Sequence, residues 1–126
     1  METNKKTILI IDDEDSYRYI YSDKLTNAGF DVLEAKDGKE GLAMAIDKKP
    51  DLILLDLGMP DMDGLSLLAK LREDPWGKGA KVIILTNISD NTKLAEAIKH
   101  ETFIYLLKSN TSMDELVSKI NKFLEQ

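Results

Sequence analysis

The sequence has no cysteine among its 126 residues, and this absence excludes disulfide bonds, zinc–thiolate sites and cysteine nucleophiles. Its only histidine, His100, is expected at the end of a helix, and no histidine-bearing helical hairpin for a phosphohistidine relay is visible. The N-terminal apolar run, Ile8–Ile11, is short and acids follow it at once, which excludes a signal peptide and a membrane-spanning helix there. We therefore expect a cytoplasmic protein that makes no contact with a membrane.

Basic residues are in the minority. Seventeen Lys and Arg against 23 Asp and Glu give a formal net charge of −6, and the lysines are scattered along predicted helices. A nucleic-acid interface needs a local basic patch that neutralises phosphates, so we expect no direct nucleic-acid binding. The length fits a single domain over residues 1–126, with enough core to fold without a disulfide or a structural metal.

Short segments rich in isoleucine, valine and leucine predict β-strands. Three of them are nearly continuous apolar runs rather than alternating ones, which is typical of strands covered on both faces and therefore of a parallel sheet between helices. The predicted strands are Thr7–Ile11, Asp31–Glu34, Leu52–Leu55, Lys81–Leu85 and Phe103–Leu107.

The segments that follow the strands have the spacing of amphipathic helices. Gly29 stands where the first helix should end in a C-terminal cap. The apolar face of this first helix is predicted to consist of Tyr17, Ile20, Tyr21, Leu25 and Ala28.

The other helices have recognisable ends. Pro50 and Pro75 lie just beyond the second and the third, and the fourth is expected to start at Asp90–Asn91. Ser112 and Glu115 form a capping box at the start of the fifth. Strict alternation of strands and helices predicts an α/β fold, a three-layer doubly wound (βα)5 arrangement with a parallel five-stranded sheet. We expect the flavodoxin-like strand order 2-1-3-4-5.

Polar residues stand just past four of the predicted strands. Asp12 and Asp13 follow the first strand, Asp56 the third, Thr86 the fourth and Lys108 the fifth. In open α/β sheets the working site lies at the carboxyl ends of the strands, near the switch in strand order. We therefore expect three carboxylates, a hydroxyl and an ammonium at one edge of the sheet.

Such a cluster of acids is predicted to hold a metal ion. Two unit charges about 4 Å apart interact by roughly 4 kcal/mol at an effective dielectric near 20, and one lysine cannot offset three carboxylates. Mg²⁺ prefers hard oxygen ligands and keeps several waters. Asp12, Asp13 and Asp56 are the predicted ligands, and the backbone carbonyl of Gly58 is a further candidate.

A metal ion and a lysine beside a carboxylate suggest phosphoryl transfer, because cations neutralise phosphoryl oxygens. Asp56 is the predicted nucleophile, since it ends the central apolar strand and a tight loop with Gly58 and Pro60 follows it. Lys108 is expected to pair with this carboxylate and then with a phosphoryl oxygen, and Thr86 to donate its hydroxyl to another.

Four motifs together carry a family resemblance: "IIDDE", "LLDLGMPDMDG", "VIILT" and "YLLK". Over roughly residues 5–124 the chain resembles the response regulator receiver domain of bacterial two-component signalling. The resemblance implies that a histidine kinase donates a phosphoryl group to Asp56 with Mg²⁺ at the paired acids. It also implies that Thr86 and Tyr105 then move together and switch the surface formed by the fourth helix, fifth strand and fifth helix.

By the same resemblance the protein is a signalling phosphoacceptor rather than an enzyme that turns over a separate substrate. The expected partners are a histidine kinase or phosphotransfer protein and a downstream protein target or fused output domain. A phosphorylation-dependent dimer is compatible with the family. Residues 1–126 would form one receiver domain, with no output domain encoded among them.

Three positions depart from the family pattern. Ser109 replaces the proline that usually follows the lysine, Asn87 replaces a small residue after the threonine, and residues 100–102 replace a Gly-Ala pair. A cis bond before a non-proline residue costs about 2.5–4 kcal/mol, which favours a trans Lys108–Ser109 bond. These departures concern the switch surface and the choice of partner.

Other interpretations stay open at this stage. The main alternative is a pseudo-receiver, an interaction module that no longer uses phosphate. A hydrolase of the haloacid dehalogenase type would need an acid where Gly58 stands, and a flavin phosphate would be repelled by the acidic first loop. Among single residues, Tyr105 is equally consistent with a core position, and Trp76 is expected to pack at the surface of a loop. Glu14 and Asp15 are expected in simple first-turn roles.

Overall fold

The computed structural model describes residues 5–87 and 104–125. Within these ranges the strands are β1 (Thr7–Ile11), β2 (Asp31–Ala35), β3 (Leu52–Leu55), β4 (Val82–Thr86) and β5 (Ile104–Leu107). The helices are α1 (Asp15–Asn27), α2 (Gly38–Lys48), α3 (Gly64–Glu73) and α5 (Met113–Leu124), with short 3-10 turns η1 (Gly77–Gly79) and η2 (Lys108–Asn110). The fourth predicted helix, with its start at Asp90–Asn91, and the predicted strand residue Phe103 lie outside the described residues.

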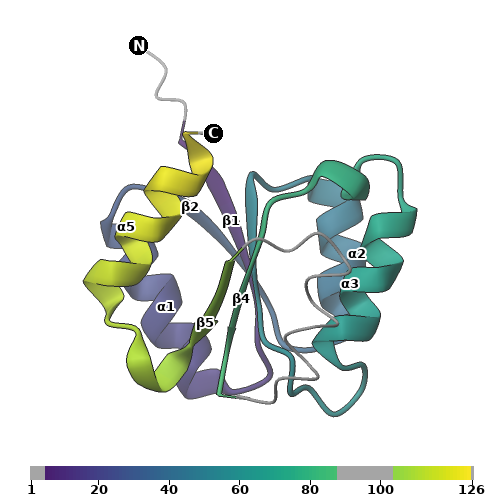
Figure 1. Cartoon of the computed structure of the whole chain (residues 1–126), viewed down its shortest axis with the longest axis horizontal. Coiled ribbons are helices and arrows are strands. Elements are labelled where there is room, and N and C mark those ends of the chain that lie inside the picture. The colour runs from purple at the N-terminus through teal and green to yellow at the C-terminus, as the bar shows by residue number, and fades with distance from the viewer. Residues whose placement is uncertain (1–4, 88–103, 126) are drawn as a thin grey trace.

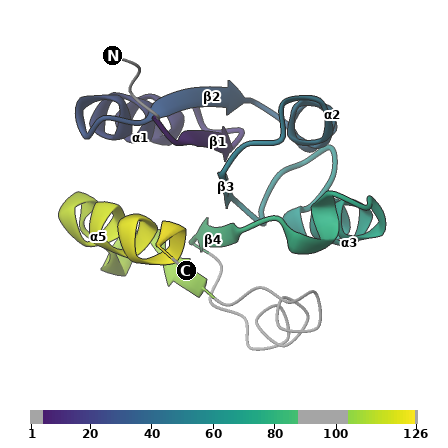
Figure 2. The same ribbon diagram turned by 90° about the horizontal axis from the view of Figure 1, so that it is seen from above.

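All five strands pair in parallel, in the order β2-β1-β3-β4-β5, as the sequence predicted. Helices α1 and α5 cover one face of this sheet, and α2 and α3 cover the other (Figures 1 and 2). Within β1, Leu9 and Ile11 pack toward α2 and α3, whereas Ile8 and Ile10 pack toward α1 and α5. Burial on both faces is the reason for the continuous apolar runs.

Helix ends follow the expected chemistry. Gly29 has a φ of 100° just after α1, a backbone conformation that glycine adopts without a Cβ clash. The Ser112 hydroxyl accepts a hydrogen bond from the backbone N–H of Glu115 at 3.1 Å, which confirms the predicted N-cap of α5. Among the described helices, none is long and apolar enough to cross a membrane.

The predicted apolar face of α1 is partly wrong. Ile20 is 54% exposed and Ala28 is exposed too, whereas Tyr21 and Leu25 are buried. Arg18 is buried on this helix, because its guanidinium finds partners in the loop before α1 and on β2. Tertiary partners therefore decided which residues of α1 face inward.

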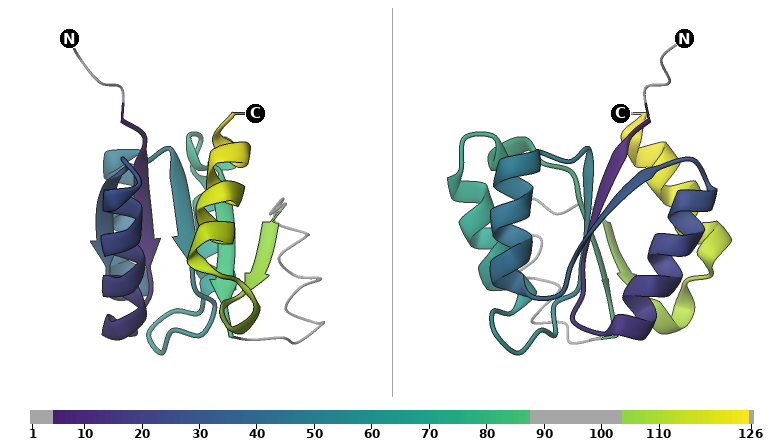
Figure 3. Two further views of the ribbon diagram at one scale, coloured as in Figure 1. Left: turned by 90° about the vertical axis from the view of Figure 1, so that its left-hand side faces the viewer. Right: turned by 180° about the vertical axis from the view of Figure 1, so that it is seen from behind.

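Strand boundaries also moved by one residue. Strand β2 includes Ala35, and β4 begins at Val82 and includes Thr86, which pairs with Leu107. Figure 3 shows that β1 starts and α5 ends at the same end of the molecule, opposite the carboxyl ends of the strands. The start of β1 and the end of α5 therefore lie away from the strand ends that carry Asp12, Asp56 and Lys108.

Candidate functional site

Four side chains converge at the carboxyl ends of β1, β3, β4 and β5. They belong to Asp12, Asp56, Thr86 and Lys108, and all four are buried. The only other charged side chain buried among the described residues is Arg18. Burial of so many polar groups at one strand edge is costly unless they satisfy one another, so their contacts define the site.

The acids approach each other closely. One carboxylate oxygen each of Asp12, Asp13 and Asp56 lies within 4.8 Å of the others, an arrangement that can hold a metal ion. Burial raises the pKa of the Asp12 carboxyl above its ordinary value of 3.8, and hydrogen bonds from Lys108 and from the Glu14 backbone N–H oppose that rise. The folded chain therefore resists the ionisation of Asp12 on which metal binding depends.

Lys108 supplies the counter-charge. Its Nζ lies 2.7 Å from Asp12 Oδ2, 3.6 Å from Asp56 Oδ2 and 3.9 Å from Glu14 Oε1. Lys108 begins the turn η2 directly after β5, and its peptide bond to Ser109 is trans, since the described residues contain no cis bond. The lysine therefore reaches the acids although Ser109 stands where the family has proline.

The Asp56 carboxylate is held from two sides. Its Oδ1 accepts a hydrogen bond from Thr86 Oγ1 at 2.7 Å and from the Gly58 backbone N–H at 3.3 Å. Its Oδ2 is the oxygen that faces Lys108. The two oxygens thus have different environments, and Asp56 has a fixed orientation at the end of the central strand.

The loop after Asp56 folds back on β3. The backbone N–H of Gly64 donates to the Leu57 carbonyl at 3.0 Å, and a Cβ at Gly64 would lie 2.6 Å from the Asp56 carbonyl oxygen. The side chain of Asp63 caps α3 by accepting from the Ser66 N–H at 2.8 Å. Only glycine fits this close approach of backbone to backbone.

Arg18 stabilises the acidic loop, and our sequence reasoning missed it. Its Nη1 donates to the Asp12 carbonyl at 2.8 Å, its Nε to Glu34 at 3.2 Å, and its Nη2 to Asp15. One feature of the sequence could have indicated its burial. Arg18 lies between the apolar-face residues Tyr17 and Tyr21, on the helix that precedes the strand with Glu34.

The first-turn acids do more than the sequence indicated. Glu14 is the N-cap residue of α1 without a side-chain cap bond, and its carboxylate lies near Lys108. Asp15 lies in the first turn, as expected, and also pairs with Arg18. Both acids therefore belong to the surroundings of the site.

The proposed switch residues are neighbours on the sheet. Tyr105 is half-buried, pairs with Ile84 across β4 and β5, and packs against the core on the α2–α3 side. Thr86 lies two residues after Ile84, so their side chains point to the same face of the sheet. Tyr105, which pairs with Ile84, lies on that face too. Thr86 and Tyr105 thus share a face of the sheet, and their switch role stays a prediction.

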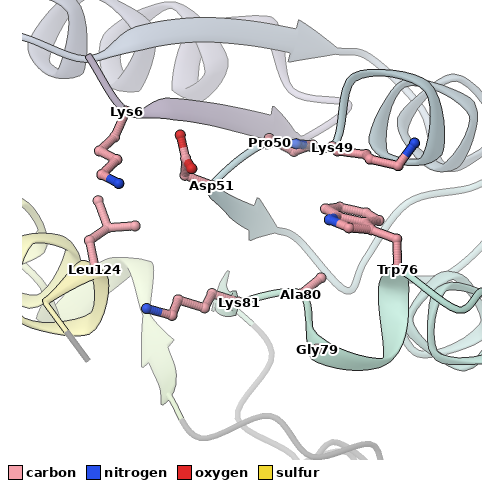
Figure 4. A pocket seen from close by; sticks show the side chains of 9 residues that line it. All are labelled: Lys6, Lys49, Pro50, Asp51, Trp76, Gly79, Ala80, Lys81 and Leu124. Carbon is pink, nitrogen blue, oxygen red and sulfur yellow. The ribbon is translucent and has the colours of Figure 1, made fainter. Parts of the chain in front are cut away.

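A separate hollow of about 250 Å³ lies at the opposite end of the sheet (Figure 4). Trp76 lines it and packs partly buried against the α2–α3 core, which agrees with the expected packing role. Lys81 also lines this hollow, and its Nζ donates to the Phe123 carbonyl at 2.9 Å. The other lining residues are Lys6, Lys49, Pro50, Asp51, Gly79, Ala80 and Leu124.

A parallel 2-1-3-4-5 sheet with three acids, a threonine and a lysine at its carboxyl edge is the arrangement of a signalling domain of the receiver type. The model of the response regulator receiver domain matches residues 8–121. The chain therefore belongs to this family of two-component systems.

Known proteins agree with this assignment. The chain is 33% identical to the transcriptional regulator RpaA of Synechocystis, over 94% of this chain and 49% of that protein. It is 33% identical to the phosphate regulon regulatory protein PhoB of Pseudomonas aeruginosa, over 96% of this chain and 52% of that protein. The chain thus spans about half the length of the curated relatives it matches.

Solved structures show the same fold. A CheY-like receiver domain protein of Methanospirillum hungatei superposes with a TM-score of 0.91 at 28% identity, covering 97% of this chain and 95% of that one. The chemotaxis protein CheY4 of Vibrio cholerae gives a TM-score of 0.87 at 28% identity, covering 94% and 98%.

Proposed function

We propose that the chain accepts one phosphoryl group on Asp56 from a histidine kinase or a phosphotransfer protein. The observation that supports this most is the placement of the Asp56 carboxylate between Thr86 Oγ1 and Lys108 Nζ, beside two further acids. In the transfer, an Asp56 carboxylate oxygen attacks phosphorus, the phosphorus–nitrogen bond of the donor phosphohistidine breaks, and the imidazole leaves with the electron pair.

The residues present fit a magnesium ion. Asp12, Asp13 and Asp56 offer hard oxygen ligands within 4.8 Å of one another, and the Gly58 carbonyl is a further candidate. When bound, Mg²⁺ would neutralise charge on the phosphoryl oxygens. Burial raises the pKa of Asp12, and a bound divalent cation would stabilise the ionised carboxylate that burial disfavours.

Lys108 and Thr86 have distinct tasks in this proposal. The Lys108 ammonium pairs with Asp56 before transfer and with a phosphoryl oxygen afterwards. The Thr86 hydroxyl now donates to Asp56 Oδ1 and would turn to the phosphoryl group instead. Tyr105 would follow on the same face of the sheet, and the surface of the fourth helix, β5 and α5 would change with it.

A small phosphodonor tests this function directly. Acetyl phosphate with Mg²⁺ should add one phosphoryl group, observed as the corresponding mass increase of the intact protein. Asp56→Asn should abolish the adduct, and Asp61→Asn, which changes an exposed acid of the same loop, should retain it. Persistence of the adduct in Asp56→Asn would refute the assignment.

The proposed function implies particular partners and a location in the cell. The upstream partner is a histidine kinase or phosphotransfer protein, and the downstream one is a protein target or a fused output domain. An output domain is compatible with the lengths of RpaA and PhoB, of which this chain covers only about half. Phosphorylation would govern any dimer. We assign the chain to the cytoplasm, where a kinase has access to ATP.

A pseudo-receiver is the second candidate. Ser109, beside Lys108, departs from the family pattern, and Lys108 at 2.7 Å already neutralises the charge of Asp12, a candidate Mg²⁺ ligand. Beryllofluoride with Mg²⁺ separates the two functions. A change in the fluorescence of Trp76 or the tyrosines supports the phosphoacceptor, and no response together with no Mg²⁺ binding supports the pseudo-receiver.

A further inference from the structure

The ammonium group of Lys108 has a fourth neighbour besides the acids. Its Nζ lies 4.0 Å from the centroid of the Tyr17 ring, in cation–π geometry. The Lys108 side chain is only 1% exposed, so water does not screen this contact. Cation–π contacts are strongest when the cation is desolvated, and this one lies inside the candidate site.

Tyr17 is itself held in place. It lies in the first turns of α1, and its ring stacks on Tyr21 with centroids 5.9 Å apart and an interplanar angle of 16°. Tyr21 is 6% exposed and belongs to the core beneath α1 and α5. The ring that faces Lys108 therefore rests on a rigid support one helical turn away.

The acids around Lys108 pull it in different directions. Its shortest contact, at 2.7 Å, is to Asp12, whereas Asp56 lies at 3.6 Å. Glu14, at 3.9 Å and with a side chain 51% exposed, draws the ammonium toward solvent. A cation taken up by Asp12 weakens the shortest contact, and the flexible lysine side chain then needs another group to keep it near Asp56.

Resting on the proposed function, we propose that Tyr17 is a positioning residue that keeps the Lys108 ammonium beside the Asp56 carboxylate. The ring face attracts the ammonium without being a metal ligand, so it does not compete for the ion. It also covers one side of the ammonium. The tyrosine thereby sets how well Lys108 can receive a phosphoryl oxygen.

A spectroscopic test does not depend on phosphorylation. In protein with ¹³C-labelled lysine, the ε-methylene signal of Lys108, assigned by its loss in Lys108→Arg, should be shifted upfield by the ring current of Tyr17. The shift should persist in Tyr17→Phe and vanish in Tyr17→Leu. A Lys108 signal at the position of the exposed lysines in the unmodified protein would overturn the proposal without any variant.

A kinetic test measures the consequence. Tyr17→Leu should slow phosphorylation by acetyl phosphate about five- to thirtyfold, the range that loss of a largely desolvated cation–π contact gives, while Tyr17→Phe stays within about twofold. Tyr19→Leu is the matched control, because Tyr19 is 60% exposed and its ring faces Arg18 instead of Lys108. Equal rates for Tyr17→Leu and the unmodified chain would refute the role of Tyr17.

The two proposals fail in different ways. If the unmodified chain takes no phosphoryl group, the proposed function fails, and the kinetic role of Tyr17 fails with it. The lysine signal still decides whether the ring holds the ammonium. If the unmodified chain is phosphorylated and Tyr17→Leu behaves identically, only the inference about Tyr17 is wrong.

Discussion

At the scale of single residues, the site contains a buried charge, that of Asp12, which lowers the stability of the folded state. Asp12 is buried, its pKa is raised mainly by that burial, and its bond to Lys108 offsets only part of the cost. Asp61 shows the opposite behaviour, because backbone N–H groups, that of Gly38 first, lower the pKa of its carboxyl. One acid is positioned for binding and the other for stability.

The pH dependence of stability should reveal this difference. Without metal, Asp12→Asn should have a higher free energy of unfolding than the unmodified chain at neutral pH. The folded carboxyl of Asp12 holds its proton to higher pH than the unfolded one, so its ionisation lowers stability as the pH rises above the ordinary value of 3.8. Urea unfolding across this pH range measures the difference, which should shrink toward acid.

Asp61→Asn is the control of opposite sign. Since the folded pKa of Asp61 is lowered, its ionised form contributes stability above the unfolded pKa, and this contribution is lost as the pH falls through the folded one. The substitution should therefore reduce stability at neutral pH. An Asp12→Asn protein that is less stable than the unmodified chain at neutral pH would contradict the argument.

At the scale of elements, side-chain bonds and close backbone contacts hold the loops that carry the acids. Arg18 ties the loop after β1 to α1 and to Glu34 of β2. Gly64 lets the start of α3 lie against the end of β3. Loops that are fixed to rigid strands and helices can position catalytic groups far more accurately than free ones.

Gly64→Ala should lower the free energy of unfolding by about 1–3 kcal/mol, the usual cost of overpacking. A Cβ there would lie 2.6 Å from the Asp56 carbonyl oxygen and 2.8 Å from Leu57 Cα, so backbone must move. Chemical denaturation measures the loss. In the control Gly79→Ala the added Cβ meets nothing within 4 Å, and stability should change little. Equal effects of the two substitutions would show that the close approach carries no strain.

Element boundaries show where sequence reasoning succeeded. The apolar runs and the Ser112 cap were predicted correctly, because burial on two faces and an N-cap leave local patterns. The exposure of Ile20 and the burial of Arg18 were not predicted. Both depend on partners from β2 and from the loop after β1, and helical periodicity carries no information about such partners.

At the scale of the whole molecule, parallel pairing brings four distant strand ends to one edge. The order β2-β1-β3-β4-β5 places β1, β3 and β4 side by side and β5 next to β4, so the groups that follow them share one pocket. The carboxylates repel one another only in the folded state, because folding brings them together. A cation that binds them therefore also stabilises the fold.

Magnesium should therefore stabilise the whole fold. A ligand that binds only the folded state at one hundred times its Kd adds about 2.7 kcal/mol, so the Tm should rise with Mg²⁺ concentration. Asp13→Asn, which removes the half-buried member of the acid group, should reduce the rise. Calorimetry with matched ionic strength in NaCl measures it, and an unchanged Tm at saturating Mg²⁺ would contradict metal binding by this pocket.

The sequence by itself determined the parallel sheet, its two covered faces and the polar residues at the strand ends, which are Asp12, Asp13, Asp56, Thr86 and Lys108. Apolar runs and the polar residues that follow them are local patterns, so they can be read directly from the sequence. Only the tertiary structure decided that Lys108 lies between Asp12 and the ring of Tyr17, and that Arg18 fastens the acidic loop. Those contacts join side chains from different elements, and their distances follow from how helices pack on the sheet rather than from any local pattern.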